Sequence, residues 1–469
     1  MPASYMSLFP QFLNALETLK IQLGTSVFFA ELQLQSVLMG FQFIKNTHQL
    51  GFRLMDLSLP LLSPVNQKEW KQLAEFYANV SEKHLFIFEK YGRACWDRIY
   101  QERKGELEFI KFFTEKLPPQ EWSFDNDRSK VLLDLPSLKL MDISLEGQHK
   151  IRNYTVVFAP RAGHHSNIAE KVALYLRDQG LSRMALVEQK CAEEIPLYVQ
   201  GKRHYDGFEG QVDQYRKILQ HLKGLSGYPS HLIAICQPGP LLISTLILNP
   251  HLGKTFGSAG SPMHAEGEGG FITDFARIMG ENYIDRLIHF FGRTVPEEYP
   301  GAGRETFDGR FQVLGFYLLG IDQHFKNLKN LLSDLKQGNE EASQRQRSFY
   351  EWYNYVHHFP VGFIRDTYKK IFINNELVRG KLFLGEKKVR LLDYPGSVPI
   401  WALGGTRDDI TPPLQAIGHV DLIPSVPLKD KLVLTCDGGH MALFRSNKIL
   451  TNEYKKILEF ILDRSNLTD

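Results

Sequence analysis

The sequence lacks the features that mark secreted, membrane-spanning and nucleic-acid-binding proteins. The first 20 residues have no basic start, apolar run and small-residue cleavage site, so we expect no secretory signal peptide. No apolar run reaches the roughly 20 residues of a spanning helix, because Glu31 and three glutamines interrupt residues 26–44. The formal net charge of +2 supplies no basic surface field, which argues against a nucleic-acid partner.

Cysteine is also scarce. Neither paired spacing nor the short spacing of metal ligands occurs among the four cysteines, Cys95, Cys191, Cys236 and Cys436. Scattered cysteines are typical of a reducing compartment. Together with the missing signal peptide, this pattern predicts a cytoplasmic protein whose core needs no disulfides.

The distribution of glycine and of apolar residues divides the chain into four regions. Residues 1–115 contain few glycines and carry apolar stripes at helical spacing, which predicts an N-terminal helical region. Residues 116–264 and 391–469 contain short apolar runs between turn residues and are expected to form the two parts of one core. Residues 265–390 are rich in aromatic and charged groups, which predicts a helical lid or cap inserted into that core.

Strands and helices alternate in the two core regions, which predicts an α/β fold with a mostly parallel sheet. The expected strands are residues 131–135, 154–159, 184–188, 231–235, 398–403 and 431–435. The expected helices are residues 167–179, 208–224, a segment from about 240, and 452–462.

Three chemically reactive side chains lie just past predicted strands. Cys236 follows one strand at a tight junction with a helix, where a nucleophile projects from the sheet. Asp408 follows another strand, and His440 lies after the last one, beyond two glycines. Because ligands bind at the carboxyl edge of open α/β sheets, we expect the three to meet there. Their chain order of nucleophile, acid and histidine is that of the α/β-hydrolase fold.

A fourth segment, residues 159–165, follows the predicted strand 154–159. We expect backbone N–H groups of Arg161 or Ala162, together with that of Gln237, to form an oxyanion hole. His164 and His165 lie in the same segment and are as readily explained as ordinary loop residues.

Each of these side chains also has a simpler explanation. Cys236 is of a type often buried in a core, Asp408 can cap a turn, and His440 can be structural. The combination of all three at three strand ends favours the catalytic interpretation. The segment around Cys236, residues 234–238, departs from the G-x-S-x-G pattern of serine esterases, because Ala234 and Pro238 stand where those enzymes have glycines.

From about residue 130 onward the chain resembles the intracellular polyhydroxybutyrate (polyhydroxyalkanoate) depolymerases. The most specific likeness is the Pro/Gly segment, residues 293–304. Further similar segments are residues 235–238, 312–316, 348–353, 379–380, 408–410 and 439–440. This resemblance implies that Cys236 is the nucleophile, Asp408 the triad acid and His440 the base. The first aspartate is preferred because the family places its acid two residues before the isoleucine.

The resemblance implies hydrolysis of the ester bonds of stored polyester through an acyl-enzyme, releasing 3-hydroxybutyrate or oligomers. The implied partner is a polyhydroxybutyrate granule or an oligomeric hydroxyalkanoate, and no metal or organic cofactor is implied. The sequence carries no signal for an oligomeric state.

Two other functions stay open. A polyhydroxyalkanoate synthase also uses cysteine on this fold and takes a coenzyme A thioester as acyl donor. A granule-associated binding protein with little activity would use its N-terminal apolar stripe, Leu8, Phe12, Leu16 and Leu19, on the polymer surface.

Overall fold

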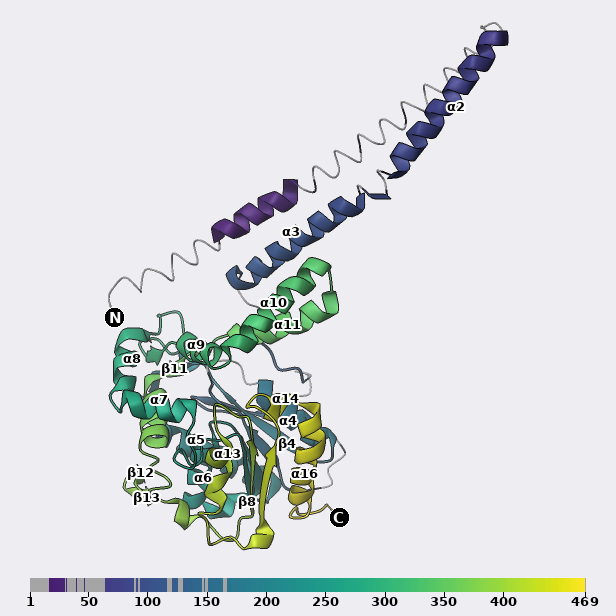
Figure 1. Cartoon of the computed structure of the whole chain (residues 1–469). Coiled ribbons are helices and arrows are strands. Elements are labelled where there is room, and N and C mark those ends of the chain that lie inside the picture. The colour runs from purple at the N-terminus through teal and green to yellow at the C-terminus, as the bar shows by residue number, and fades with distance from the viewer. Residues whose placement is uncertain are drawn as a thin grey trace. The chain divides into compact units, whose positions relative to one another are not determined.

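The computed structural model describes most of the chain and is shown in Figure 1. It describes residues 17–29, 31, 39, 46, 64–87, 90–91, 93–115, 120–124, 130–145, 147, 151–162 and 167–468. The stripe residues Leu8, Phe12 and Leu16, and the loop residues His164 and His165, lie outside these ranges. Within the described residues, no helix is both long enough and apolar enough to cross a membrane.

The chain divides into two compact units. The first comprises Met1–Pro118 and Gly320–Glu351. Residues 17–29 of this unit are helical, and its helices with described bounds are α2 (Pro64–Ile87), α3 (Arg93–Thr114), α10 (Ile321–Gln337) and most of α11 (Glu340–Asn354). Helices α3 and α10 cross closely at Gly105, where a Cβ atom would collide with the backbone of Leu335. An ion pair of 2.9 Å between Lys336 and Glu106 lies beside this crossing.

The second unit comprises Pro119–Leu319 and Trp352–Asp469 and contains an eight-stranded sheet. The strand order is β1-β2-β4-β3-β7-β8-β14-β15. The bounds are β1 Lys130–Asp134, β2 Leu138–Asp142, β3 Thr155–Phe158, β4 Met184–Gln189, β7 Ser230–Ile235, β8 Gly253–Ala259, β14 Ile400–Gly405 and β15 Lys431–Cys436.

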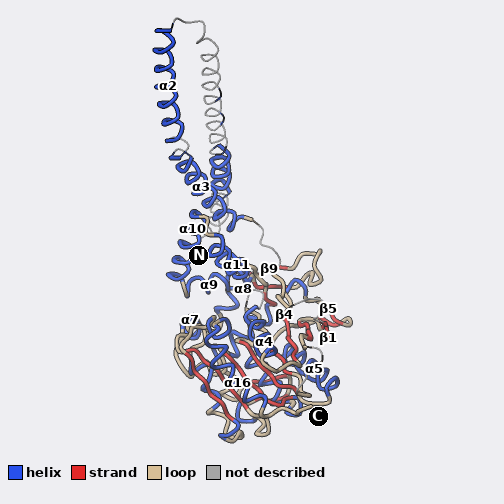
Figure 2. Tube along the Cα trace, turned by 90° about the vertical axis from the view of Figure 1, so that its right-hand side faces the viewer, coloured by secondary structure: helices blue, strands red, loops and turns tan. Residues whose placement is uncertain are grey.

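The sheet is mostly parallel, as the sequence predicts. Strand β2 pairs antiparallel with β1 and β4, and every other neighbouring pair is parallel. Figure 2 shows these strands enclosed by helices. The exchange of β3 and β4 in the order, with the antiparallel strand near one edge, is the topology of the α/β-hydrolase fold. The predicted fold class is confirmed.

Helices cover both faces of this sheet (Figure 1). One group consists of α5 (Phe208–Ser226) and α6 (Gly239–Leu248), which pack together. The other consists of α4 (Asn167–Asp178), α14 (Ala442–Arg445) and α16 (Lys455–Leu462). Strands fully buried between two helical layers are expected to be apolar throughout, and β3 and β7 are buried at every residue.

The predicted strands and helices of the core all occur within one to three residues of their expected bounds, but two strands of the eight-stranded sheet were missed. Strand β8 has the composition Gly-Lys-Thr-Phe-Gly-Ser-Ala, which carries little strand signal. Gly257 is needed in this strand because the indole of Trp401 on the adjacent strand β14 occupies the space where its Cβ would lie. Strand β2 was missed as well, a short segment directly after the turn that follows β1.

Between β8 and β14 the second unit contains mainly helices and five short strands, of which β12 (Leu382–Leu384) and β13 (Lys387–Val389) pair with each other. The helices are α7 (Phe271–Met279), α8 (Tyr283–Phe291), α9 (Gly309–Leu319) and α12 (Val361–Asp366). The strands β9 (Gly292–Thr294), β10 (Glu305–Phe307) and β11 (Phe359–Pro360) form a small separate sheet. The role of this region as a lid stays a prediction.

Candidate active site

Cys236 lies at a strained turn between β7 and α6. Its φ angle is +61°, a left-handed conformation that a residue with a side chain adopts at an energetic cost. The N–H of Cys236 donates to the carbonyl of Ala259 on the neighbouring strand β8, at 2.9 Å. The strand, the turn and the helix therefore hold the thiol at the carboxyl edge of the sheet, where it is partly exposed.

His440 and Asp408 reach the same edge from the loops after β15 and β14. The distance from His440 Nε2 to Cys236 Sγ is 3.2 Å, and that from His440 Nδ1 to Asp408 Oδ2 is 2.7 Å. His440 is 8% exposed and Asp408 is 3% exposed, so little water competes for these contacts. The structure therefore brings together the three side chains that the sequence singled out.

The surroundings of His440 stabilise its protonated form. Burial by itself lowers the pKa of His440, but the adjacent negative charges of Asp408 and Cys236 outweigh it and raise that pKa well above its usual range. The site therefore favours the imidazolium form of His440.

The carboxylate of Asp408 is itself held in place. Its Oδ1 accepts the N–H groups of Ile410 at 3.0 Å and of Thr411 at 2.8 Å, which leaves Oδ2 for the imidazole. Asp409 is exposed. Of the two adjacent aspartates, Asp408 is therefore the one that contacts His440.

The expected oxyanion donors differ in how they are engaged. The N–H of Gln237 has no hydrogen-bond partner within the described part of the chain, and the same holds for the N–H of Ala162. The N–H of Arg161, by contrast, donates to the side-chain Oε1 of Gln237 at 2.9 Å. Sequence reasoning missed this second contribution of Gln237, and its only signal was a long polar side chain directly after the nucleophile.

A cleft of about 380 Å³ adjoins the acid of this site. Its lining residues include the charged Arg407, Asp408 and Asp409 and the apolar Phe271 and Leu319, together with prolines and glycines. A volume of this size accommodates a small ligand or a short segment of a chain.

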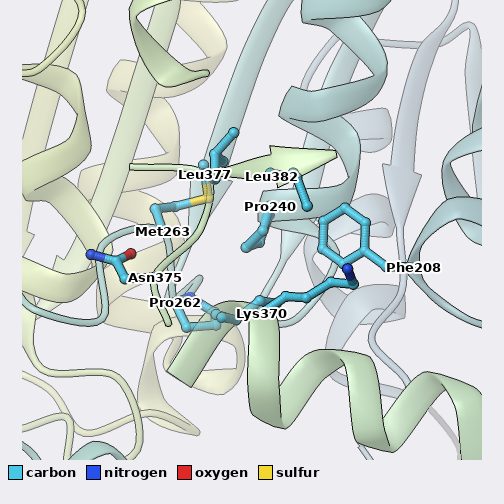
Figure 3. A pocket seen from close by; sticks show the side chains of 9 residues that line it. Phe208, Pro240, Pro262, Met263, Lys370, Asn375, Leu377 and Leu382 are labelled. Carbon is cyan, nitrogen blue, oxygen red and sulfur yellow. The ribbon is translucent and has the colours of Figure 1, made fainter. Parts of the chain in front are cut away.

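A second hollow lies beside the start of helix α6 (Figure 3). Phe208, Pro240, Met263 and Lys370 are among its lining residues, and its volume is about 10 Å³. That is room for about one water molecule, so this hollow does not accommodate a substrate. Within the described ranges, no group of three or more His, Cys, Asp or Glu side chains is placed to hold a metal ion.

One comparison with known proteins agrees with the sequence resemblance. Residues 260–465 match the family model described as PHB de-polymerase C-terminus, which confirms the resemblance over that range. No curated protein matches the chain.

Several solved structures are similar. A monoacylglycerol lipase of Paleococcus ferrophilus is 14% identical, with a TM-score of 0.39, and the match covers 70% of this chain and 99% of that one. A 2-hydroxy-6-oxo-6-phenylhexa-2,4-dienoate hydrolase of Rhodococcus sp. is 12% identical, with a TM-score of 0.39 and coverage of 71% and 98%. A thermophilic esterase of Thermogutta terrifontis is 12% identical, with a TM-score of 0.38 and coverage of 70% and 94%.

Proposed function

On the premise that residues 260–465 are a PHB depolymerase C-terminal domain, we propose that this α/β hydrolase cleaves the ester bonds of polyhydroxybutyrate. Cys236 is the nucleophile, His440 the base and Asp408 the acid that orients it. The observation that carries this proposal is the continuous contact from Asp408 Oδ2 through the imidazole to Cys236 Sγ. The coupling of a nucleophile to an oriented base is the arrangement that activates a weak nucleophile.

In the first half-reaction the Cys236 thiolate attacks an ester carbonyl carbon of the polymer. The resulting oxyanion accepts the N–H groups of Gln237 and Ala162, which have no other partner among the described residues. The tetrahedral intermediate then breaks its bond to the alkoxide oxygen, and the His440 imidazolium gives its proton to that oxygen. A thioester on Cys236 and a shortened polymer with a free hydroxyl result.

In the second half-reaction water hydrolyses the thioester. His440, now neutral, takes a proton from the water, and the resulting hydroxide attacks the thioester carbonyl. The C–S bond breaks, which restores the Cys236 thiolate beside the imidazolium and releases a carboxylic acid. The products are 3-hydroxybutyrate or short oligomers.

An apolar polymer is supported by the surface beside the cleft. Phe271, which lines the cleft, also belongs to an exposed face of α7 with Phe275 and Ile278. The rings of Phe271 and Phe275 stack with centroids 6.0 Å apart, and Ile278 is 82% exposed. Contiguous exposed apolar side chains of this kind mark surfaces that contact apolar partners.

The proposal is tested by the release of soluble 3-hydroxybutyrate from native amorphous granules. We expect release by the wild type and none by Cys236→Ala, while both proteins unfold at the same temperature. Cys95→Ala is the matched control, because it removes an exposed thiol of the other unit and is expected to keep full activity. Equal release by the wild type and Cys236→Ala would exclude Cys236 as the nucleophile.

The same experiment separates the two rival functions. Absence of release from the wild type, with incorporation of 3-hydroxybutyryl coenzyme A into polymer, would establish a synthase. Granule binding with neither activity would establish a binding protein.

A further inference from the structure

Arg161 lies on the loop that follows β3, beside the candidate oxyanion donor Ala162, and its side chain is buried. Its Nη1 forms an ion pair of 2.7 Å with Asp206 Oδ2, and both side chains are almost fully inaccessible to solvent. Gln211 donates to the other oxygen of the same carboxylate at 2.8 Å. Burial alone raises the pKa of Asp206, but the Arg161 guanidinium outweighs it and lowers that pKa, so both groups are charged.

The guanidinium of Arg161 is confined on its remaining sides. It lies over the ring of Phe363, at 4.8 Å from the centroid, and its Nη2 approaches the carbonyl of Ser137 at 3.4 Å. An ion pair so far from solvent contributes little net stability, since both groups lose their hydration. The ion pair acts instead on geometry. Because the Arg161 guanidinium cannot leave the Asp206 carboxylate, it fixes the position of the Arg161 backbone.

The loop that carries Asp206 is also held by the Pro/Gly segment, residues 293–304. Arg304, the last residue of that segment, is buried and donates to the carbonyls of Ile195, Pro196 and His204 at 3.1, 2.6 and 3.2 Å. His204 is two residues before Asp206, so Arg304 holds the loop that carries the partner of Arg161. These contacts give the Pro/Gly segment, the most specific part of the family resemblance, a role in holding this loop.

Gln237, the residue after the nucleophile, connects the loop of Arg161 to the turn at Cys236. Its Oε1 accepts the N–H of Arg161 at 2.9 Å. The loop after β3 is therefore held by two contacts, one from the Arg161 side chain to Asp206 and one from the Arg161 backbone to the Gln237 side chain. With the N–H of Arg161 engaged in this way, the N–H of Ala162 is the one left for an oxyanion.

We propose that Arg161, Asp206 and the side chain of Gln237 are positioning residues that hold the loop after β3, so that Ala162 and Gln237 present their N–H groups to the same oxyanion. Arg304 extends this support to the Pro/Gly segment. The inference rests on the proposed function, because it assigns oxyanion stabilisation at the same site. None of the three side chains transfers a proton or forms a bond to the substrate.

The test compares two reactions of the same thiol. Acylation of Cys236 by p-nitrophenyl butyrate, followed in a single turnover, passes through an oxyanion, whereas alkylation by iodoacetamide depends on the thiolate and forms no tetrahedral oxyanion. Asp206→Asn is expected to slow acylation by about 10²-fold, as misplaced catalytic groups do, and to leave the alkylation rate within twofold of the wild type.

Two further variants complete the design. Gln237→Leu removes the acceptor for the Arg161 N–H without leaving a buried charge unpaired, so it tests the inference even if Asp206→Asn does not fold. It is expected to slow acylation by roughly tenfold, with alkylation unchanged. Asp393→Asn is the matched control, because it neutralises the aspartate of an exposed Arg390–Asp393 pair and is expected to change neither reaction.

Each outcome supports or overturns the positioning role, the proposed hydrolase function, or both. A loss of acylation with normal alkylation in Asp206→Asn or Gln237→Leu supports the inference. Equal losses in both reactions, or no loss in either variant, overturn it. A wild type that is acylated but does not turn over refutes the hydrolase function and leaves the positioning role standing, and a wild type that is not acylated refutes both.

Discussion

The imidazole Nε2 of His440 lies 3.2 Å from the sulfur of Cys236, although 204 positions of sequence separate the two residues. The contact joins the end of β7 to the loop after β15, which are separated in the sheet by β8 and β14. Only the parallel arrangement of these strands brings both carboxyl ends to one edge. The contact therefore depends on the whole sheet and on no local segment.

Asp408→Asn should lower the pKa of His440, because the carboxylate charge is the strongest of the influences that raise it. The imidazolium would then lose its proton at a lower pH than in the wild type. We expect kcat to fall by roughly 10⁴-fold, as when a triad aspartate is made neutral. Titration of the His440 Cε1–H signal by NMR measures the first effect and single-turnover kinetics the second. An unchanged His440 titration would contradict this account of the site.

The double variant Phe275→Ser, Ile278→Ser should separate polymer from soluble substrates. Both residues are exposed on α7 beside the cleft, and burying one large apolar side chain contributes about 1.5–3 kcal/mol. We expect about tenfold weaker action on granules and unchanged hydrolysis of p-nitrophenyl butyrate.

Leu428→Ser is the matched control for this surface. Leu428 is 86% exposed, but it begins the short helix Leu428–Asp430 that directly precedes β15, and so lies at the amino edge of the sheet, away from Cys236. A loss of granule activity as large as that of the double variant would show that any exposed apolar residue contributes.

His231 should make the free energy of unfolding depend on pH. Burial lowers its pKa to about 3, with a smaller contribution from Lys254, and its two ring nitrogens contact Thr255 and Ser465. The unfolded chain binds a proton at this residue below about pH 6.5, whereas the folded chain does not. Stability is therefore present above that pH and falls by up to about 1.4 kcal/mol per unit as the pH drops toward 3.

Replacement His231→Gln removes this titration. Urea unfolding between pH 7 and pH 4 should show a shallower loss of stability for the variant than for the wild type. Parallel curves for the two proteins would rule out His231 as the source of the pH dependence.

Gly301→Ala should destabilise the second unit. A Cβ atom there would lie 2.7–2.9 Å from the carbonyl oxygens of Ala192, Glu193 and Ile195, so the Pro/Gly segment would have to move. Overpacking of this kind costs about 1–3 kcal/mol, seen as a lower unfolding temperature. Gly315→Ala is the matched control, because its Cβ meets nothing within 4 Å in helix α9 and should stabilise slightly. A normal unfolding temperature for Gly301→Ala would contradict the proposed packing.

Local sequence patterns were sufficient for most elements of the core. Strand β7 contains the apolar run of residues 232–235, and helix α4 begins and ends within one residue of its predicted bounds. Strand β8 carries little strand signal, and its Gly257 is required by the indole of Trp401, which lies 144 positions further along the chain. A pattern limited to neighbouring residues cannot contain that information.

The sequence by itself determined the residue types of the candidate site and the strand ends that carry them. The strained turn at Cys236 was open to sequence reasoning because it depends on a short segment, whereas the choice of Asp408 over Asp409 came from the family resemblance. Tertiary structure alone decided that the N–H of Arg161 is held by Gln237, and that its guanidinium is buried against Asp206. Those contacts join segments 45 to 76 residues apart, so only the packing of the strands and helices between them determines which atoms meet.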